Sequence, residues 1–192
     1  MHTFFEYRDG GGHMGNYTFI QTPIEDLYVI EPQVYGDHRG FFMETYTKKA
    51  FDGEGIEASF VQDNHSKSDK NVLRGLHFQI NRPQAKLLRV IRGKIYDVAV
   101  DLRPNSSSYG KWYGLELSAD NKRQFYVPKG FAHGFLTLED QTEVLYKTTD
   151  YYYPEDEGGI IYNDPTLAIP WPVEEAKIIL SDKDRKLSRF DR

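Results

Sequence analysis

The sequence contains no cysteine, which excludes disulfide bonds and catalysis by a thiolate. It has no apolar run approaching the ~20 residues of a membrane helix, and no signal peptide is visible. Positive charge is not in excess either, because the net charge is −5 and the isoelectric point is about 5.7. A broad basic face is therefore not expected. We predict a cytoplasmic protein that binds neither nucleic acid nor membranes.

Aromatic residues, in contrast, are abundant. The 192 residues include 14 Tyr and 12 Phe, and such large rings favour strands, where they pack across a pleated surface. The length fits one domain with a sizeable core. We expect this domain to span residues 14–192, because the glycine-rich stretch ahead of Met14 is typical of a linker or tag remnant covering residues 1–13.

Short extended segments separated by turns occupy most of the chain. Strand patterns fall at 28–32, 41–46, 59–64, 72–79, 87–91, 95–102, 111–117, 124–127, 134–138 and 144–148. A helical turn is expected near 48–51 and a short helix at 181–187. Clusters of Gly, Pro, Asn and Asp lie between many of the strands. This spacing predicts an all-β sandwich, barrel or jelly roll with a few short helices.

The segment 95–102 has the clearest alternation of apolar and polar residues. Val98 and Val100 lie on one face, whereas Asp97 and Asp101 lie on the other. The polar face either lines the interior of a barrel, where it can hold a ligand, or faces solvent. The sequence leaves both possibilities open.

The stretch from Pro128 to His133 resembles the second motif of metal-binding cupin barrels. Such sites need three or four N or O ligands, including a His-x-His pair and a nearby carboxylate. Gln79 occupies the position where the pair begun by His77 needs a second histidine, and no acidic residue lies between Gln79 and Asp97. The ligand count therefore argues against a metal, and a metal-dependent cupin enzyme is the less favoured alternative.

Several motifs occur in one order along the chain, at residues 37–44, 62–66, 73–79, 128–135, 145–147 and 180–184. Together they resemble the dTDP-4-dehydrorhamnose 3,5-epimerase family over residues 14–184. The resemblance implies a cupin-like jelly roll, an isomerase without a cofactor, and a homodimer that exchanges strands near the N-terminus. The implied substrate is a dTDP-4-keto-6-deoxyhexose. The implied reaction inverts C3 and C5 of dTDP-4-dehydro-6-deoxy-D-glucose to give dTDP-4-dehydro-L-rhamnose.

A ketone at C4 acidifies the protons at C3 and C5, but these remain weak acids. The reaction needs a base, a cation for the enolate oxygen, and an acid on the opposite face of the sugar. By the resemblance, His77 is the base, Asp184 orients it, Lys86 is the cation and Tyr146 is the acid. Without the resemblance, each has an ordinary structural explanation: a packed polar histidine, a helix cap, a solvated lysine and a core aromatic.

The resemblance also implies a set of substrate contacts. Two arginines serve the diphosphate, and Tyr151 stacks on the thymine, although Tyr152 and Tyr153 follow it directly and leave the register open. The implied contacts are Arg39, Glu44, Gln62, Asn64, Arg74, His133, Tyr151, Glu157 and Lys183. Two alternatives remain: an epimerase acting at C3 alone, and a non-catalytic protein that binds a sugar nucleotide.

Overall fold

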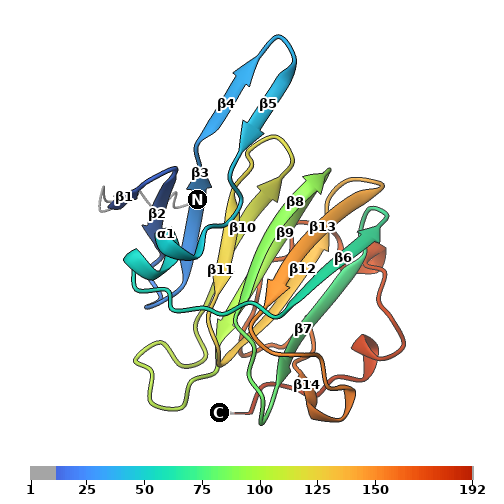
Figure 1. The fold of residues 1–192 in the computed structure, drawn as a ribbon. Coiled ribbons are helices and arrows are strands. Elements are labelled where there is room, and N and C mark those ends of the chain that lie inside the picture. Colours follow the sequence, from blue (N-terminus) through green and yellow to red (C-terminus); the bar gives the residue numbers. More distant parts are fainter. Residues whose placement is uncertain (1–11, 192) are drawn as a thin grey trace.

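The computed structural model describes residues 12–191 of the chain (Figure 1). The expected remnant at residues 1–13 therefore lies outside the described residues, apart from Gly12 and His13, whose backbone belongs to the first strand. No helix among the described residues is long and apolar enough to span a membrane.

Antiparallel strands form two main sheets and a separate hairpin. The first sheet has the strand order β1-β2-β3-β11-β8-β13-β6, the second has the order β10-β9-β12-β7-β14, and β4 pairs with β5. The strands of the first sheet are Gly12–Met14, Tyr17–Gln21, Tyr28–Pro32, Gln124–Val127, Lys86–Arg92, Thr142–Thr148 and Gln62–Ser68, in that order. Those of the second are Trp112–Ser118, Lys94–Asp101, Phe131–Thr137, Leu73–Gln79 and Glu157–Gly159. The hairpin strands are Val34–Asp37 and Gly40–Met43.

The two sheets pack face to face as a jelly roll, so the predicted fold class is confirmed (Figure 1). The core between them contains apolar side chains of both sheets, among them Leu88, Phe125, Ile95 and Phe135. Sheets of this kind bury one face of each strand against the other sheet. The interior is therefore formed by alternate residues of each strand.

Other parts of the chain pack on the outer faces of both sheets. The helix α1, Lys48–Gly53, places Phe51 against Phe19 and other residues of the first sheet. The C-terminal segment from Ile160 to Phe190 packs on the second sheet, where Val98 and Val100 meet Leu167. This segment contains the 3₁₀ helices Glu175–Lys177 and Asp184–Lys186, and a third 3₁₀ helix, Pro154–Asp156, precedes it. Both faces of β12 and of most of β9, two central strands of the second sheet, are thus buried.

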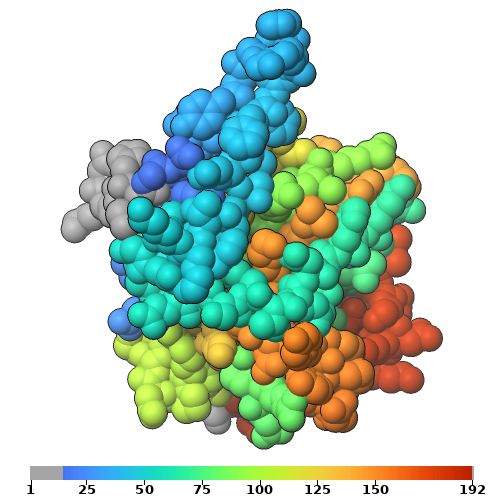
Figure 2. Space-filling view, viewed as in Figure 1, coloured from blue at the N-terminus to red at the C-terminus, as the bar shows by residue number. Residues whose placement is uncertain are grey.

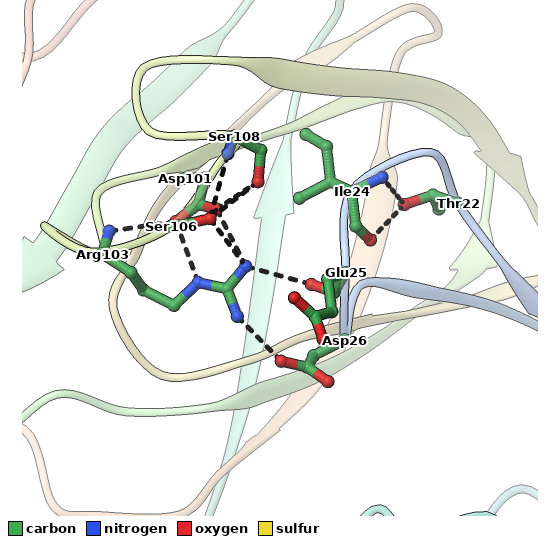
Figure 3. Close-up of polar contacts among 8 residues, drawn as sticks. All are labelled: Thr22, Ile24, Glu25, Asp26, Asp101, Arg103, Ser106 and Ser108. Carbon is green, nitrogen blue, oxygen red and sulfur yellow. Dashed lines mark hydrogen bonds and ion pairs between the residues drawn. The ribbon is translucent and has the colours of Figure 1, made fainter.

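A charged cluster fixes the end of β9 to the turn that precedes β3 (Figure 3). The carboxylate of Asp101 is fully buried and accepts hydrogen bonds from Arg103, Ser106 and Ser108. The Arg103 guanidinium also reaches the Asp26 carboxylate at 2.8 Å. Because the buried charge is paired and hydrogen-bonded, the cluster can hold the loop without leaving a polar group unsatisfied.

The β4–β5 hairpin projects away from the body of the molecule (Figure 2). It carries Tyr35, Phe41 and Phe42, which are 51%, 61% and 66% exposed. A group of large apolar side chains this exposed is uncommon on the surface of a monomer.

The polar face of segment 95–102 points into the interior of the jelly roll. Asp97 and Asp101 are fully buried on the side that faces the interior, together with Ala99 of the core. Three expected strands differ by three or more residues at one end or both. The strand expected at 59–64 is β6, Gln62–Ser68, the one expected at 134–138 is β12, Phe131–Thr137, and the one expected at 41–46 is β5, Gly40–Met43. β6 differs most. Its pairing with β13 sets these limits, because Gln62 lies opposite Thr148 and Ser68 lies opposite Thr142.

Candidate active site

The interior of the jelly roll opens into a cavity of about 460 Å³, which we call the inner cavity. It is large enough for a small-molecule ligand. Its lining comes from both sheets and from the C-terminal segment, and comprises Ser66, Val72, Leu73, Arg74, His77, Lys86, His133, Phe135, Tyr146, Ile179, Leu180, Ser181, Lys183 and Asp184. All four of the predicted catalytic residues are in this set.

His77 projects from β7 and forms a close pair with Asp184. The distance from His77 Nε2 to Asp184 Oδ1 is 2.5 Å, and Asp184 is almost fully buried. Burial would raise the pKa of the Asp184 carboxyl, but the hydrogen bond from His77 and a further one from Ser181 hold that pKa below its usual value. The carboxylate therefore fixes the orientation of the ring and can stabilise an imidazolium.

The cap predicted for Asp184 also exists, but it uses another atom. The Ser181 hydroxyl accepts a hydrogen bond from the Asp184 backbone N–H at 3.0 Å. The helix cap and the contact with His77 are thus compatible, because the backbone of Asp184 serves one and its carboxylate serves the other.

Two glycines bring the strands of His77 and His133 together. Gly75 has a φ of +114°, and a Cβ on it would lie 2.6 Å from Gly134 Cα. A Cβ on Gly134 would lie 2.7 Å from the carbonyl oxygen of Arg74. The two histidines are direct neighbours across β7 and β12, and the register shifts between His133 and Phe135. Only glycines permit so close an approach.

Lys86 begins β8 and lines the inner cavity from the other sheet. Burial lowers the pKa of its ammonium group to about 8, although the negative charges of Asp97 and Glu157 oppose this shift. The side chain therefore carries its positive charge near neutral pH although it is largely buried. A cation in such surroundings interacts strongly with a developing negative charge.

Tyr146 comes from β13, beside Lys86 in the same sheet, since Thr148 pairs with Lys86 in the β13–β8 register. Burial raises the pKa of its phenol, whereas the nearby Arg74 opposes this shift. The hydroxyl consequently keeps its proton across the neutral range and is available as an acid.

His133 is a second buried histidine with a carboxylate partner. Its Nε2 lies 2.8 Å from Asp97 Oδ1, and both side chains are almost fully enclosed. Burial lowers the pKa of the imidazole, and the charge of Asp97 opposes the shift. The ring is therefore neutral at pH 7, with its Nε2–H donating to Asp97.

A smaller adjoining cavity of about 230 Å³ shares His77, Lys86 and Tyr146 with the inner cavity. It brings in three of the predicted contacts, namely Gln62, Asn64 and Glu157. Glu157 forms an ion pair with Lys183 and accepts a hydrogen bond from Tyr152. Burial would raise the pKa of Glu157, but these two contacts hold it below its usual value.

Three predicted contacts lie elsewhere in the described chain. Arg39 is at the tip of the β4–β5 hairpin, where it pairs with Asp37, and its side chain is 78% exposed. Glu44 follows that hairpin and accepts a hydrogen bond from Asn16. Tyr151 does not line either cavity, whereas its neighbour Tyr152 lines the adjoining one.

Sequence reasoning missed three polar groups of the site. Tyr152 belongs to a run of three tyrosines, so the sequence does not distinguish it from its neighbours. Asp97 belongs to a strand for which the sequence does not indicate whether the polar face points inwards. Ser66 lines the inner cavity with a buried hydroxyl that has no partner among the described residues. The alternation of Gln62, Asn64 and Ser66 along β6 was the signal that would have found it.

The arrangement of the His, Asp and Glu side chains decides whether they could hold a metal ion. In the part of the chain that the structure describes, no group of three or more His, Asp or Glu side chains is arranged to hold a metal ion. The histidines of the cavity pair with carboxylates instead.

Comparisons with known proteins agree on one family. The family model described as dTDP-4-dehydrorhamnose 3,5-epimerase matches residues 21–192. A relative from Escherichia coli K12 with that name is 56% identical over 174 residues, covering 90% of this chain and 94% of its own. A crystal structure of the Bacillus anthracis protein with that name, with TDP and PPi bound, is 50% identical with a TM-score of 0.87, covering 91% and 99%. A Legionella pneumophila dTDP-6-deoxy-D-glucose-3,5-epimerase in complex with dTDP-4-keto-L-rhamnose is 47% identical with a TM-score of 0.86, covering 92% and 100%.

Proposed function

We propose, from the premise that this chain belongs to the dTDP-4-dehydrorhamnose 3,5-epimerase family, that His77 is the base of its reaction. The chain is accordingly an isomerase, and the reaction inverts C3 and C5 of dTDP-4-dehydro-6-deoxy-D-glucose to give dTDP-4-dehydro-L-rhamnose. The observation that carries the proposal is the inner cavity, where the His77–Asp184 pair, Lys86 and Tyr146 come together.

In the first step His77 removes the proton next to the ketone. The electron pair of the C–H bond forms the enolate, and the imidazole becomes an imidazolium that Asp184 stabilises. The ammonium of Lys86 faces the same cavity and compensates the negative charge on the enolate oxygen. An interaction of this kind lowers the barrier by several kcal/mol in a site that excludes water.

In the second step Tyr146 returns a proton to the carbon from the opposite face. Its phenol is protonated at neutral pH because burial raises its pKa. Tyr146 comes from the first sheet and His77 from the second, so the two groups approach a ligand in the cavity from different sides. Inversion at carbon requires this arrangement of acid and base.

The nucleotide part of the substrate is proposed to occupy the side of Arg74, Lys183 and the adjoining cavity. Arg74 supplies a guanidinium, which suits a diphosphate. Tyr152, at 49% exposed, takes the stacking role that we had expected of Tyr151. Gln62, Asn64 and Glu157 provide further polar contacts.

A homodimer is proposed to complete the site. Arg39 and Glu44 lie on or next to the projecting hairpin, away from the cavity of their own chain. The exposed Phe41 and Phe42 on that hairpin suit burial against a second copy of the chain. Exchange of the hairpin between subunits would bring Arg39 towards the nucleotide. A cytoplasmic location fits a chain without cysteine.

Proton exchange in heavy water tests the function. The wild-type protein, incubated with the 4-keto sugar nucleotide, should incorporate deuterium at both C3 and C5, as followed by proton NMR and mass spectrometry. His77→Asn should slow this exchange by at least about 100-fold, because the base is lost. The matched control is His65→Asn, since His65 pairs with Glu143 on the outside of the sheet.

Each other outcome has a defined meaning. Deuterium at C3 alone would support an epimerase that acts at that carbon only. Binding of the sugar nucleotide without any exchange would support a non-catalytic binding protein. Near-normal exchange in His77→Asn would show that His77 is not the base.

A further inference from the structure

Asp97 carries a buried carboxylate, one oxygen of which has no hydrogen-bond partner among the described residues. It lies in the middle of β9, is fully enclosed, and faces the interior of the jelly roll. Its Oδ1 contacts His133 Nε2, but its Oδ2 is buried without a hydrogen-bond partner among residues 12–191. Because burial of an unsatisfied carboxylate oxygen is costly, such an atom needs a compensating charge or a functional reason.

Lys86 is a candidate for that charge, because it lines the inner cavity together with His133, the ring that Asp97 contacts. Of the two acidic groups that raise the pKa of Lys86, Asp97 has the larger effect and Glu157 the smaller. Glu157 already forms an ion pair with Lys183 and a hydrogen bond with Tyr152, so its charge is shared. Asp97 Oδ2 has no such competitor.

The other titratable groups around Lys86 contribute differently. His77, Tyr146 and Asp184 line the inner cavity with Lys86, and so do the two cations Arg74 and Lys183. Asp184 is engaged by His77. The cations, together with burial, favour loss of the proton from Lys86. A further negative charge is therefore needed to keep Lys86 protonated.

We propose that Asp97 is a positioning residue, whose carboxylate holds the His133 ring with one oxygen and keeps Lys86 charged with the other. The proposal rests on the proposed function, because it assigns Lys86 to the enolate oxygen. It gives the site two carboxylate–histidine pairs on adjacent strands, of which only His77–Asp184 moves a proton.

The pair with Asp97 also defines what His133 offers to a ligand. When Nε2–H donates to Asp97, the other ring nitrogen keeps its lone pair and is an acceptor. His133 can then accept a hydrogen bond from a sugar hydroxyl, but it cannot donate one to the enolate oxygen. Stabilisation of the enolate is left to Lys86, which makes its charge state decisive.

The same strand contains a second buried aspartate, Asp101, which serves as a comparison for a purely structural role. Asp101 lies four residues further along β9, on the same face, and is equally buried. Its carboxylate is saturated by Arg103 and two serines, none of which lines the inner cavity, whereas His133, the partner of Asp97, does. Asp101→Asn is therefore the matched control for Asp97→Asn.

The experiment titrates Lys86 directly by NMR in protein with isotope-labelled lysine, with Lys86→Arg used to assign its signal. In Asp97→Asn the midpoint for Lys86 should fall by about one pH unit, because a neighbouring negative charge is removed. The alkaline limb of the kcat profile for deuterium exchange should move by the same amount. Asp101→Asn should lower stability without moving either midpoint.

An unchanged Lys86 midpoint in folded Asp97→Asn would overturn the proposal. The NMR titration needs no substrate, so it gives an answer even if the wild-type protein fails to exchange deuterium, which would count against the proposed function alone. If Asp97→Asn does not fold, His133→Gln provides the second variant. It removes the ring and keeps the carboxylate, so the Lys86 midpoint should not fall; a fall of about one unit would assign the effect to His133 instead.

Discussion

Asp101 shows how a single buried charge contributes to the fold. Burial disfavours its ionised form, but hydrogen bonds from Arg103, Ser106 and Ser108 outweigh this effect and lower its pKa to about 2 (Figure 3). The folded-state pKa is thus below that of the unfolded chain. Asp101 therefore stabilises the protein above about pH 4, and this contribution is lost as the pH falls towards 2.

Asp101→Asn should lower the free energy of unfolding at pH 7 by about 2 kcal/mol, because the Arg103 cation loses its buried partner. Urea unfolding at pH 7 and at pH 3 measures this cost, and the gap between variant and wild type should narrow at the lower pH. Asp37→Asn is the control, since Asp37 pairs with an arginine on the exposed hairpin. A constant gap at both pH values would contradict the assignment.

The contact between the strands β7 and β12 determines the geometry of the site. The two strands meet at Gly75 and Gly134, next to the facing histidines. The nearest atom that a Cβ would meet at either glycine belongs to the backbone rather than to a flexible side chain. The separation of His77 and His133 therefore depends directly on these two glycines.

Gly134→Ala should push β7 and β12 apart, since its Cβ would lie 2.7 Å from the carbonyl oxygen of Arg74. We expect a loss of about 2 kcal/mol in stability, as in other overpacked cores. Measured kcat should fall more than KM changes, because the proposed base His77 is displaced while the nucleotide contacts of β6 and the C-terminal segment remain. Gly36→Ala is the control, as its nearest contact would be at 3.7 Å. Normal kcat in a destabilised Gly134→Ala would separate this contact from catalysis.

The elements also show what the sequence could and could not predict. Strands with alternating or apolar patterns, such as 95–102 and 124–127, were found close to their true limits. The strand displaced most was β6, whose residues Gln62–Ser68 are all polar, so pairing with β13 rather than an apolar face defines its ends. A period of two reveals that faces differ, but not which one points inwards.

For the site, the motifs identified side chains that the fold does assemble, including His77, Lys86, Tyr146 and Asp184 in one cavity. Asp97 was not predicted as a site residue, because the direction of its side chain depends on how the two sheets pack. In the proposed dimer, the position of Arg39 depends on where the hairpin docks on the second subunit, which a single chain does not contain. Both are properties of tertiary or quaternary structure and leave no local pattern.

The exposed aromatic side chains of the β4–β5 hairpin are the feature of the molecule that a single chain explains least. These side chains are largely exposed to solvent, although Lys122 makes a cation–π contact with the ring of Phe41. Burial of two such rings in an interface would stabilise it substantially.

Phe42→Asp should weaken self-association by about 30-fold, the equivalent of a 2 kcal/mol interface residue. Sedimentation equilibrium measures the dissociation constant, and KM for the sugar nucleotide should rise in parallel if Arg39 acts across the interface. Ile80→Asp is the control, because Ile80 is similarly exposed, at 63%, away from the hairpin. A monomeric wild-type protein with full activity would refute the proposed dimer.

The His77–Asp184 contact joins residues 107 positions apart. The strands of both sheets all precede Ile160, whereas Asp184, which we propose orients the base, follows them. During synthesis the ribosome therefore releases the complete set of strands before Asp184 emerges. The growing chain can pair its strands before the C-terminal wall of the inner cavity forms, while His77 still lacks its contact with Asp184. The proposed catalytic pair is thus completed last.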